Sequence, residues 1–176
     1  MKLKYLFSAL ILLLVLMACK QSDPDNRSGL YPTIGERMKM APFEMISLTD
    51  KKTLNSKQFE GQVLLVTFFA TWCPPCIQEI PTLKALQDTF KAKGFSVLAF
   101  SVDEGDVDPL VNLIDKYDIN YPVFLEDPVV TKSFGRVTGI PVTFLVNRKG
   151  EIVKKYLGYV GYDLLEKAVG NMLTAG

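Results

Sequence analysis

Two cysteines lie three positions apart in residues 72–76, which read Trp-Cys-Pro-Pro-Cys, and the chain has only one other cysteine. At this spacing two thiols can close a small disulfide with little movement of the backbone. The pair follows the apolar run of residues 63–69 and precedes a predicted helix, a setting typical of a redox-active CxxC. A thiolate at the start of a helix faces unpaired N–H groups and the positive end of the dipole, which lowers its pKa. The pattern predicts thiol–disulfide exchange.

Structural roles compete with redox chemistry for this pair. Buried structural cysteines normally lie on an apolar face and lack flanking prolines. A zinc site needs about four ligands, and the chain has no histidine and no second cysteine pair. Only a metal shared between two chains would fit, so we expect no metal and no other cofactor. Without histidine, proton transfer at the thiols depends on carboxylates, lysines, backbone groups or water.

Composition narrows the class of protein further. The 176 residues carry 20 Lys+Arg against 19 Asp+Glu, and no basic stripe with interleaved aromatic residues is present. This balance gives no indication of nucleic-acid binding. The length predicts one domain with a single core.

The first 18 residues have the parts of a secretory signal peptide. Lys2 and Lys4 precede an apolar stretch over residues 5–16, and Ala18 stands directly before Cys19. This resembles the bacterial lipoprotein signal, in which the cysteine becomes the lipid-modified first residue. An uncleaved anchor is the alternative, although the stretch is shorter than the ~20 residues of a spanning helix. We expect a signal peptide over 1–18, a polar tether over 19–35 and a domain over 36–176, held extracytoplasmically at a bacterial membrane.

Alternating elements surround the cysteine pair. We expect strands over 43–48, 63–69, 95–102 and 122–125, helices over 75–93, 108–117, 128–134 and 162–173, and a β-hairpin of 142–146 and 151–156. Pro81 falls inside the first helix and predicts a kink. Strands that alternate with helices and end in a hairpin predict an α/β fold, with a mixed sheet between helices on both faces.

From about Ile34 to the C-terminus the sequence resembles the TlpA/ResA group of extracytoplasmic thiol–disulfide oxidoreductases, which have a thioredoxin-like fold. The resemblance is carried by Ala-Pro-Phe at 41–43, by 61–69, by Ala-Thr-Trp-Cys-Pro-Pro-Cys at 70–76, by Glu79 with Pro81, and by Gly-Ile-Pro-Val-Thr-Phe at 139–144. The stretch of residues 103–138 corresponds to the group's helix-and-strand insertion. That insertion could shape the choice of partner or merely extend the core.

The resemblance implies roles for the site residues. Cys73 would be the exposed attacking thiolate, and the more buried Cys76 would resolve the mixed disulfide. Pro141 matches the group's cis-proline, against an ordinary trans turn proline as the alternative. Ile140 would pair through its backbone with an extended substrate, and Trp72 would complete the substrate-binding surface.

Thr67 departs from the pattern of cytoplasmic thioredoxins, which carry a buried aspartate at this place for proton transfer. Glu79 is the expected substitute, because it lies three residues past Cys76 on the same helical face. A partly buried carboxylate there would accept the proton of the nearby thiol. A solvated helix glutamate is the alternative.

Pro74 and Pro75 are expected to tune the redox potential. Both lack an N–H group, so the Cys73 thiolate has fewer backbone donors than in other loops. Less stabilisation of the thiolate makes the protein less oxidising, with a potential nearer the roughly −270 mV of thioredoxin than the roughly −120 mV of DsbA.

The resulting hypothesis is a membrane-tethered reductase of disulfide-containing proteins, with cytochrome c maturation as one role. A transmembrane thiol electron donor would reduce it again. A peroxiredoxin-like function is disfavoured because the Pro-x-x-x-Thr-x-x-Cys setting is missing, and a Sco-type copper-handling function because it needs wider cysteine spacing and a histidine. A non-catalytic lipoprotein scaffold would leave the CxxC unexplained.

Overall fold

A computed structural model describes residues 38–135 and 137–175 of the chain. The predicted signal peptide over 1–18 and the predicted tether over 19–35, with the proposed lipidation site Cys19, lie outside the described residues. No helix within the described ranges is both long and apolar enough to cross a membrane.

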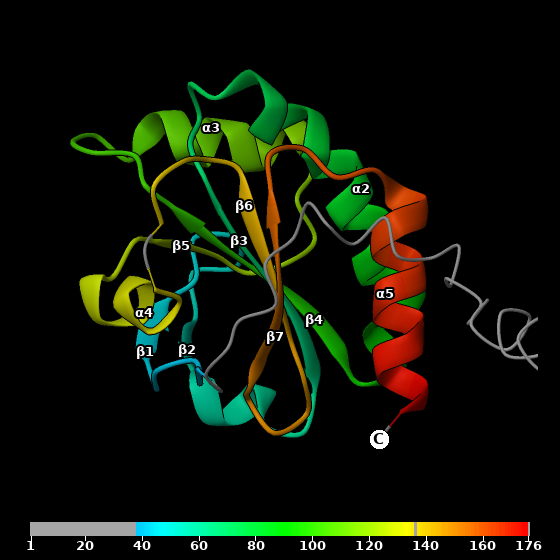
Figure 1. Cartoon of the computed structure of the whole chain (residues 1–176). Coiled ribbons are helices and arrows are strands. Elements are labelled where there is room, and N and C mark those ends of the chain that lie inside the picture. Colours follow the sequence, from blue (N-terminus) through cyan, green and yellow to red (C-terminus); the bar gives the residue numbers. More distant parts are fainter. Residues whose placement is uncertain (1–37, 136, 176) are drawn as a thin grey trace, which may run out of the picture. The chain divides into compact units, whose positions relative to one another are not determined.

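A five-stranded mixed sheet forms the centre of the fold, with the strand order β5-β4-β3-β6-β7 (Figure 1). The strands are Val63–Phe69 (β3), Phe95–Ser101 (β4), Val123–Leu125 (β5), Val142–Val146 (β6) and Ile152–Leu157 (β7). β3 pairs parallel with β4 and antiparallel with β6. Every residue of β3 is buried, as expected for a central strand covered on both faces. The predicted mixed sheet and its closing hairpin are confirmed.

Four α-helices flank the sheet in the described part of the chain: Pro74–Phe90 (α2), Asp108–Tyr117 (α3), Pro128–Ser133 (α4) and Tyr162–Thr174 (α5). The predicted ranges are confirmed to within a few residues. The first predicted helix ends earlier, because α2 gives way to the 3₁₀ turn Lys91–Lys93 (η3) before Gly94, whose φ of 80° is left-handed. α2 continues as helix across Pro81.

A small antiparallel hairpin stands beside the main sheet. It joins Glu44–Ile46 (β1) to Thr53–Asn55 (β2), and the 3₁₀ turn Ser56–Phe59 (η2) follows. Asn55 caps this turn by accepting a hydrogen bond from the Lys57 amide at 3.0 Å. The sequence predicted a strand over 43–48 but neither β2 nor η2.

Two apolar cores lie on the two faces of the sheet. On one face, Leu86 of α2, Leu110 of α3 and Leu165 of α5 pack with strand residues such as Leu65. On the other, Val130 of α4 and residues around the β1–β2 hairpin pack with Phe68, Phe100 and Phe144. Helices therefore cover both faces, as predicted, and β3 between the two cores is a rigid support for the segment that follows it.

Candidate active site

Cys73 and Cys76 form a disulfide, with an S–S distance of 2.06 Å and a Cα–Cα distance of 5.3 Å. The pair follows β3 after a short turn, and Cys73 is the residue that caps α2. Pro74 and Pro75 occupy the first two helical positions, where their missing N–H groups leave no intrahelical bond unmade. The predicted bonding of the two cysteines at the start of a helix is confirmed.

Cys73 is less accessible than expected. The residue is 4% exposed and Cys76 is 2% exposed, so the prediction of an exposed Cys73 is wrong for this disulfide form. The bond to Cys76 draws the Cys73 sulfur toward the first turn of α2. The residues on either side of Cys73 are exposed to solvent instead: Trp72 is 68% exposed, and Pro74 is also exposed.

A carboxylate holds the turn before the cysteines. Asp103, just after β4, accepts hydrogen bonds from the Thr71 amide at 3.0 Å and the Thr71 hydroxyl at 2.7 Å. The Ser101 hydroxyl donates to the same carboxylate at 2.5 Å. These bonds tie the turn to the end of the neighbouring strand. Sequence reasoning missed Asp103. The available signal was its position, since a carboxylate directly after a parallel strand lies at the carboxyl edge of the sheet.

The Ile140–Pro141 peptide bond is cis, which confirms the expectation for Pro141. The register pairs Val142 with Phe68, so Pro141 lies at the same edge of the sheet as the end of β3 and the cysteine turn. Pro141 is buried and Ile140 half-buried. The backbone before β6 and the exposed ring of Trp72 thus share one edge with the disulfide.

Glu79 is buried under α2, with 1% of the residue exposed, so the alternative of a solvated helix glutamate is wrong. Its Oε1 accepts a hydrogen bond from the Val160 amide at 3.1 Å, and its Oε2 lies 3.5 Å from the Thr143 hydroxyl. Burial is the main cause that raises the pKa of Glu79 from 4.5 to about 7, and these two bonds oppose it only in part. A carboxyl group with this pKa changes protonation near neutral pH.

Thr67 lies on the sheet beneath Glu79 and takes part in the same polar cluster. Thr143 of β6 is its direct partner in the register, and the Thr143 hydroxyl donates to the Thr67 hydroxyl at 3.0 Å. Sequence reasoning noticed Thr67 but missed Thr143, because their contact depends on the register between strands distant in the chain.

A small cavity joins Cys76 to Glu79. Its volume is about 10 Å³, and it is lined by Thr67, Phe69, Cys76, Glu79, Ile80, Leu83, Ala99 and Tyr121. This volume is close to the minimum that accommodates one water molecule. The cavity therefore brings together a resolving thiol position, a carboxyl group near its titration point and a tyrosine that sequence reasoning did not single out.

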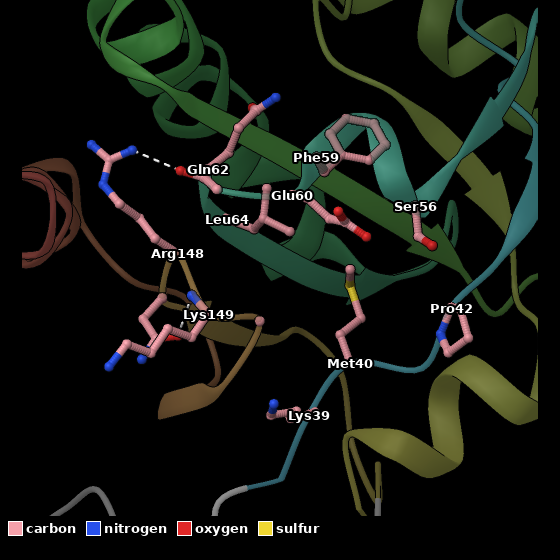
Figure 2. A pocket seen from close by; sticks show the side chains of 13 residues that line it. Lys39, Met40, Pro42, Ser56, Phe59, Glu60, Gln62, Leu64, Arg148 and Lys149 are labelled. Atoms are coloured by element: carbon pink, nitrogen blue, oxygen red, sulfur yellow. Dashed lines mark hydrogen bonds between the residues drawn. The ribbon is translucent and has the colours of Figure 1, made fainter. Parts of the chain in front are cut away.

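A larger hollow of about 490 Å³ lies at the other end of β3, where Leu64 lines it. Arg148 and Lys149 line this hollow together with Leu64 (Figure 2), and the guanidinium of Arg148 donates to the carbonyl of Gly61 at 2.7 Å. Neither cysteine nor Glu79 lines this hollow. The site near the cysteines is thus separate from it by the length of β3.

No group of three or more His, Cys, Asp or Glu side chains among residues 38–135 and 137–175 could hold a metal ion. The side chains that meet near the disulfide are instead two sulfurs, one buried carboxyl group, hydroxyls and an aromatic ring. Such a set supports disulfide exchange coupled to proton transfer.

Comparisons with known proteins agree with this geometry. The model of the Redoxin family matches residues 35–173. Thiol-disulfide oxidoreductase ResA of Bacillus thuringiensis subsp. konkukian (strain 97-27) is 30% identical, over 78% of this chain and 80% of that protein. ResA of Bacillus subtilis (strain 168) is also 30% identical, over 77% of this chain and 75% of that protein. The crystal structure of a thiol:disulfide interchange protein, a thioredoxin family protein from Chlorobium tepidum TLS, superposes with a TM-score of 0.72 at 28% identity, covering 79% of this chain and 98% of that one.

Proposed function

We propose that this chain, which belongs to the Redoxin family, reduces disulfide bonds of other proteins on the outer side of a bacterial membrane to which it is tethered. Its fold is thioredoxin-like, and it is a thiol–disulfide oxidoreductase related to ResA. The observation that carries the proposal is the Cys73–Cys76 disulfide at the start of α2 beside a buried carboxyl group.

The reaction begins from the dithiol form. The Cys73 thiolate attacks a sulfur of the substrate disulfide, so that a bond between Cys73 and the substrate forms and the substrate S–S bond breaks. The first substrate thiolate leaves and takes a proton. Cys76 then attacks the Cys73 sulfur, which closes the intramolecular disulfide and releases the second substrate thiol. Two electrons have passed from the cysteine pair to the substrate.

Geometry supports the order of the two cysteines. Cys73 is the cap of α2 and the less buried of the pair, next to the exposed Trp72. Cys76 lies one turn inside the helix and lines the internal cavity with Glu79. The first sulfur is therefore nearer to a docked partner, and the second is nearer to a proton acceptor.

Glu79 acts as that acceptor in our proposal. Cys76 must lose its proton before it can attack, and a carboxylate whose pKa is about 7 can take the proton and later return it at neutral pH. Few other groups can do so here, since the chain has no histidine.

Substrate binding is assigned to the edge that carries the disulfide. An exposed Trp72 ring offers apolar contact area, and Ile140 offers backbone groups to an extended segment beside Pro141. Disulfide-containing proteins are the substrates that fit, with apocytochrome c among them. The predicted lipid on Cys19 would provide the tether, and a transmembrane thiol protein would supply electrons.

Trapping in cells tests the substrate and the tether together. The full chain with Cys76→Ser is expected to accumulate mixed disulfides with envelope proteins in the membrane fraction, identified by mass spectrometry. The double variant Cys19→Ala/Cys76→Ser is the control and should form the adducts but release them from the membrane. Adducts confined to cytoplasmic proteins, or a membrane association that survives Cys19→Ala, would contradict the corresponding part of the proposal.

A further inference from the structure

Tyr121 lies just before β5 and is almost fully buried, with 2% of the residue exposed. Its backbone carbonyl accepts a hydrogen bond from the Thr49 hydroxyl at 2.8 Å. The side chain lines the cavity of about 10 Å³ that also meets Thr67, Cys76 and Glu79. A polar group from a distant part of the chain is thus placed beside the resolving cysteine and the carboxyl group.

Tyr121 lines this cavity, and a buried hydroxyl normally has a hydrogen-bond partner. The cavity has the volume of about one water molecule. A buried water typically makes about three hydrogen bonds, and the hydroxyls of Tyr121 and Thr67 with the Glu79 carboxyl group offer that number of partners. The site is therefore both polar enough and large enough for one water.

The phenol stays protonated in this surrounding. Burial, followed by the nearby charge of Glu79, raises the pKa of Tyr121 above its usual value. Tyr121 can therefore donate a hydrogen bond at neutral pH but cannot serve as the base that deprotonates Cys76.

We propose that Tyr121 is a positioning residue, whose hydroxyl donates to a water that links Cys76 to Glu79 and so stabilises the charged form of the Glu79 carboxylate. This inference rests on the proposed role of Glu79. The water takes the proton of the Cys76 thiol as it passes one of its own to the carboxylate, so it is restored by the transfer. The Tyr121 proton does not leave.

The other groups that face Glu79 carry no charge. β6 presents the Thr143 hydroxyl, the segment after β7 presents the Val160 amide, and β3 presents Thr67. β7 contributes Tyr156, which is the cross-strand partner of Thr143 in the antiparallel β6–β7 pair. α2 itself contributes Cys76, which does not titrate in the disulfide form.

Tyr121→Phe tests the proposal in the disulfide form. The variant keeps the ring and removes one oxygen, and the Glu79 carboxyl carbon is followed by NMR from pH 4 to 10. Loss of the donor to the water should raise the titration midpoint of Glu79 by about half to one pH unit, because the water then donates a weaker and less well oriented hydrogen bond to the charged carboxylate. The matched control Tyr117→Phe, on α3 away from the cavity, should leave the midpoint unchanged. An unchanged or lowered midpoint in Tyr121→Phe would overturn the proposal.

A second measurement uses the unaltered protein and does not depend on how the variant folds. A long-lived water should give nuclear Overhauser contacts to the Tyr121 ring protons, and their absence would also overturn the proposal. Neither experiment involves turnover. Failure of the Tyr121 role would therefore leave disulfide reduction intact, whereas failure of the proposed function would appear as loss of exchange at Cys73 with the Glu79 titration unaltered.

Discussion

Among the individual side chains, Glu79 is the buried carboxyl group that lies beside Cys76 and can change its protonation near neutral pH. It is held by the Val160 amide and enclosed by α2 and the sheet, so bulk solvent cannot stabilise its charge. The same burial that raises its pKa to about 7 places it where it can exchange a proton with Cys76. In our proposal Glu79 takes the place of the buried aspartate of cytoplasmic thioredoxins, in a chain that has no histidine.

Glu79→Gln should change how thiol reactivity depends on pH. In the unaltered protein the rate at which reduced Cys76 closes the disulfide should show an inflection near pH 7, where Glu79 titrates. Glutamine keeps the bond from the Val160 amide but does not titrate, so the inflection should disappear and closure should slow by about tenfold or more at pH 7–8, where Glu79 is ionised, and much less at pH 5. Stopped-flow measurement of mixed-disulfide resolution over pH 5–9 provides the profile.

Glu60→Gln is the control for that experiment, since Glu60 is exposed at the other end of β3. Its profile should match that of the unaltered protein. A profile for Glu79→Gln that also matches would remove Glu79 from the proton transfer.

Sequence reasoning identified those site residues whose position depends on local spacing. Cys76 and Glu79 share a helical face, and the buried state of Glu79 follows from that face packing on the sheet. Tyr121 and Asp103 could not be identified in this way, because only the pairing of β4 and β5 with the rest of the sheet brings them to the site. The burial of Cys73 in the disulfide form was not predicted, because a sequence does not specify which redox state the structure adopts.

Among the helices, α2 has the unusual start that sets the electrostatics of Cys73. The amides of the second and third positions are the ones that normally donate to a capping side chain. In α2 the second position is Pro75, which has no N–H group, and the first is Pro74. The Cys73 thiolate consequently lacks one donor that a helix start would otherwise offer.

Pro75→Ala should make the protein more oxidising. The restored amide stabilises the Cys73 thiolate by about 1.5 kcal/mol, as a hydrogen bond to a charged group, and this corresponds to an increase in potential on the order of 30 mV. The starting value is expected nearer the roughly −270 mV of thioredoxin than the roughly −120 mV of DsbA. Equilibration with glutathione, followed by quantification of both forms, measures the potential.

Pro74→Ala is the matched control, because a capping side chain accepts from the amides of the second and third helical positions rather than the first. Its potential should shift less than that of Pro75→Ala. Equal shifts for the two variants, or a more reducing Pro75→Ala, would show that the second amide does not set the potential.

The longer elements were predictable because their hydrophobic patterns are extended. β3 is a run of seven buried residues, and α3 has its apolar residues on one face. The β1–β2 hairpin was not predicted in full, since β2 has only three residues and owes its conformation to pairing with β1. The 3₁₀ turns are shorter than a helical period and leave little pattern.

In the folded chain as a whole, the enclosed carboxyl group of Glu79 opposes stability at neutral and alkaline pH. Its pKa is 4.5 when unfolded and about 7 when folded. Below pH 4.5 both states are protonated and the group has no effect. As pH rises toward 7 the unfolded state ionises first, so stability falls, and above the folded pKa the loss amounts to about 3 kcal/mol.

Glu79→Gln should therefore stabilise the disulfide form at pH 8 by roughly 2–3 kcal/mol, with much less effect at pH 4. Urea unfolding at both values, monitored by Trp72 fluorescence and circular dichroism, gives the free energies of unfolding. A gain that is equal at the two values would indicate a packing effect, and a loss at pH 8 would contradict the raised pKa.

The apolar cores and the reactive groups occupy different parts of the fold. Two apolar cores hold the sheet from both faces, and the disulfide, the cis-proline and Trp72 belong to segments at one edge of the sheet. The α/β layering was predictable, because alternating strands and helices permit few arrangements. The tether over residues 19–35 and the lipid on Cys19 stay predictions of the sequence.

The most direct test of the account is capture of a mixed disulfide in vitro. Reduced Cys76→Ser protein is mixed with a peptide that contains one disulfide, and the products are analysed by mass spectrometry without reductant. The account predicts a single adduct on Cys73 that accumulates because no second thiol resolves it, and none on the companion variant Cys73→Ser over the same time. Failure to form that adduct, or an equal yield from Cys73→Ser, would contradict the assignment of Cys73 as the attacking sulfur.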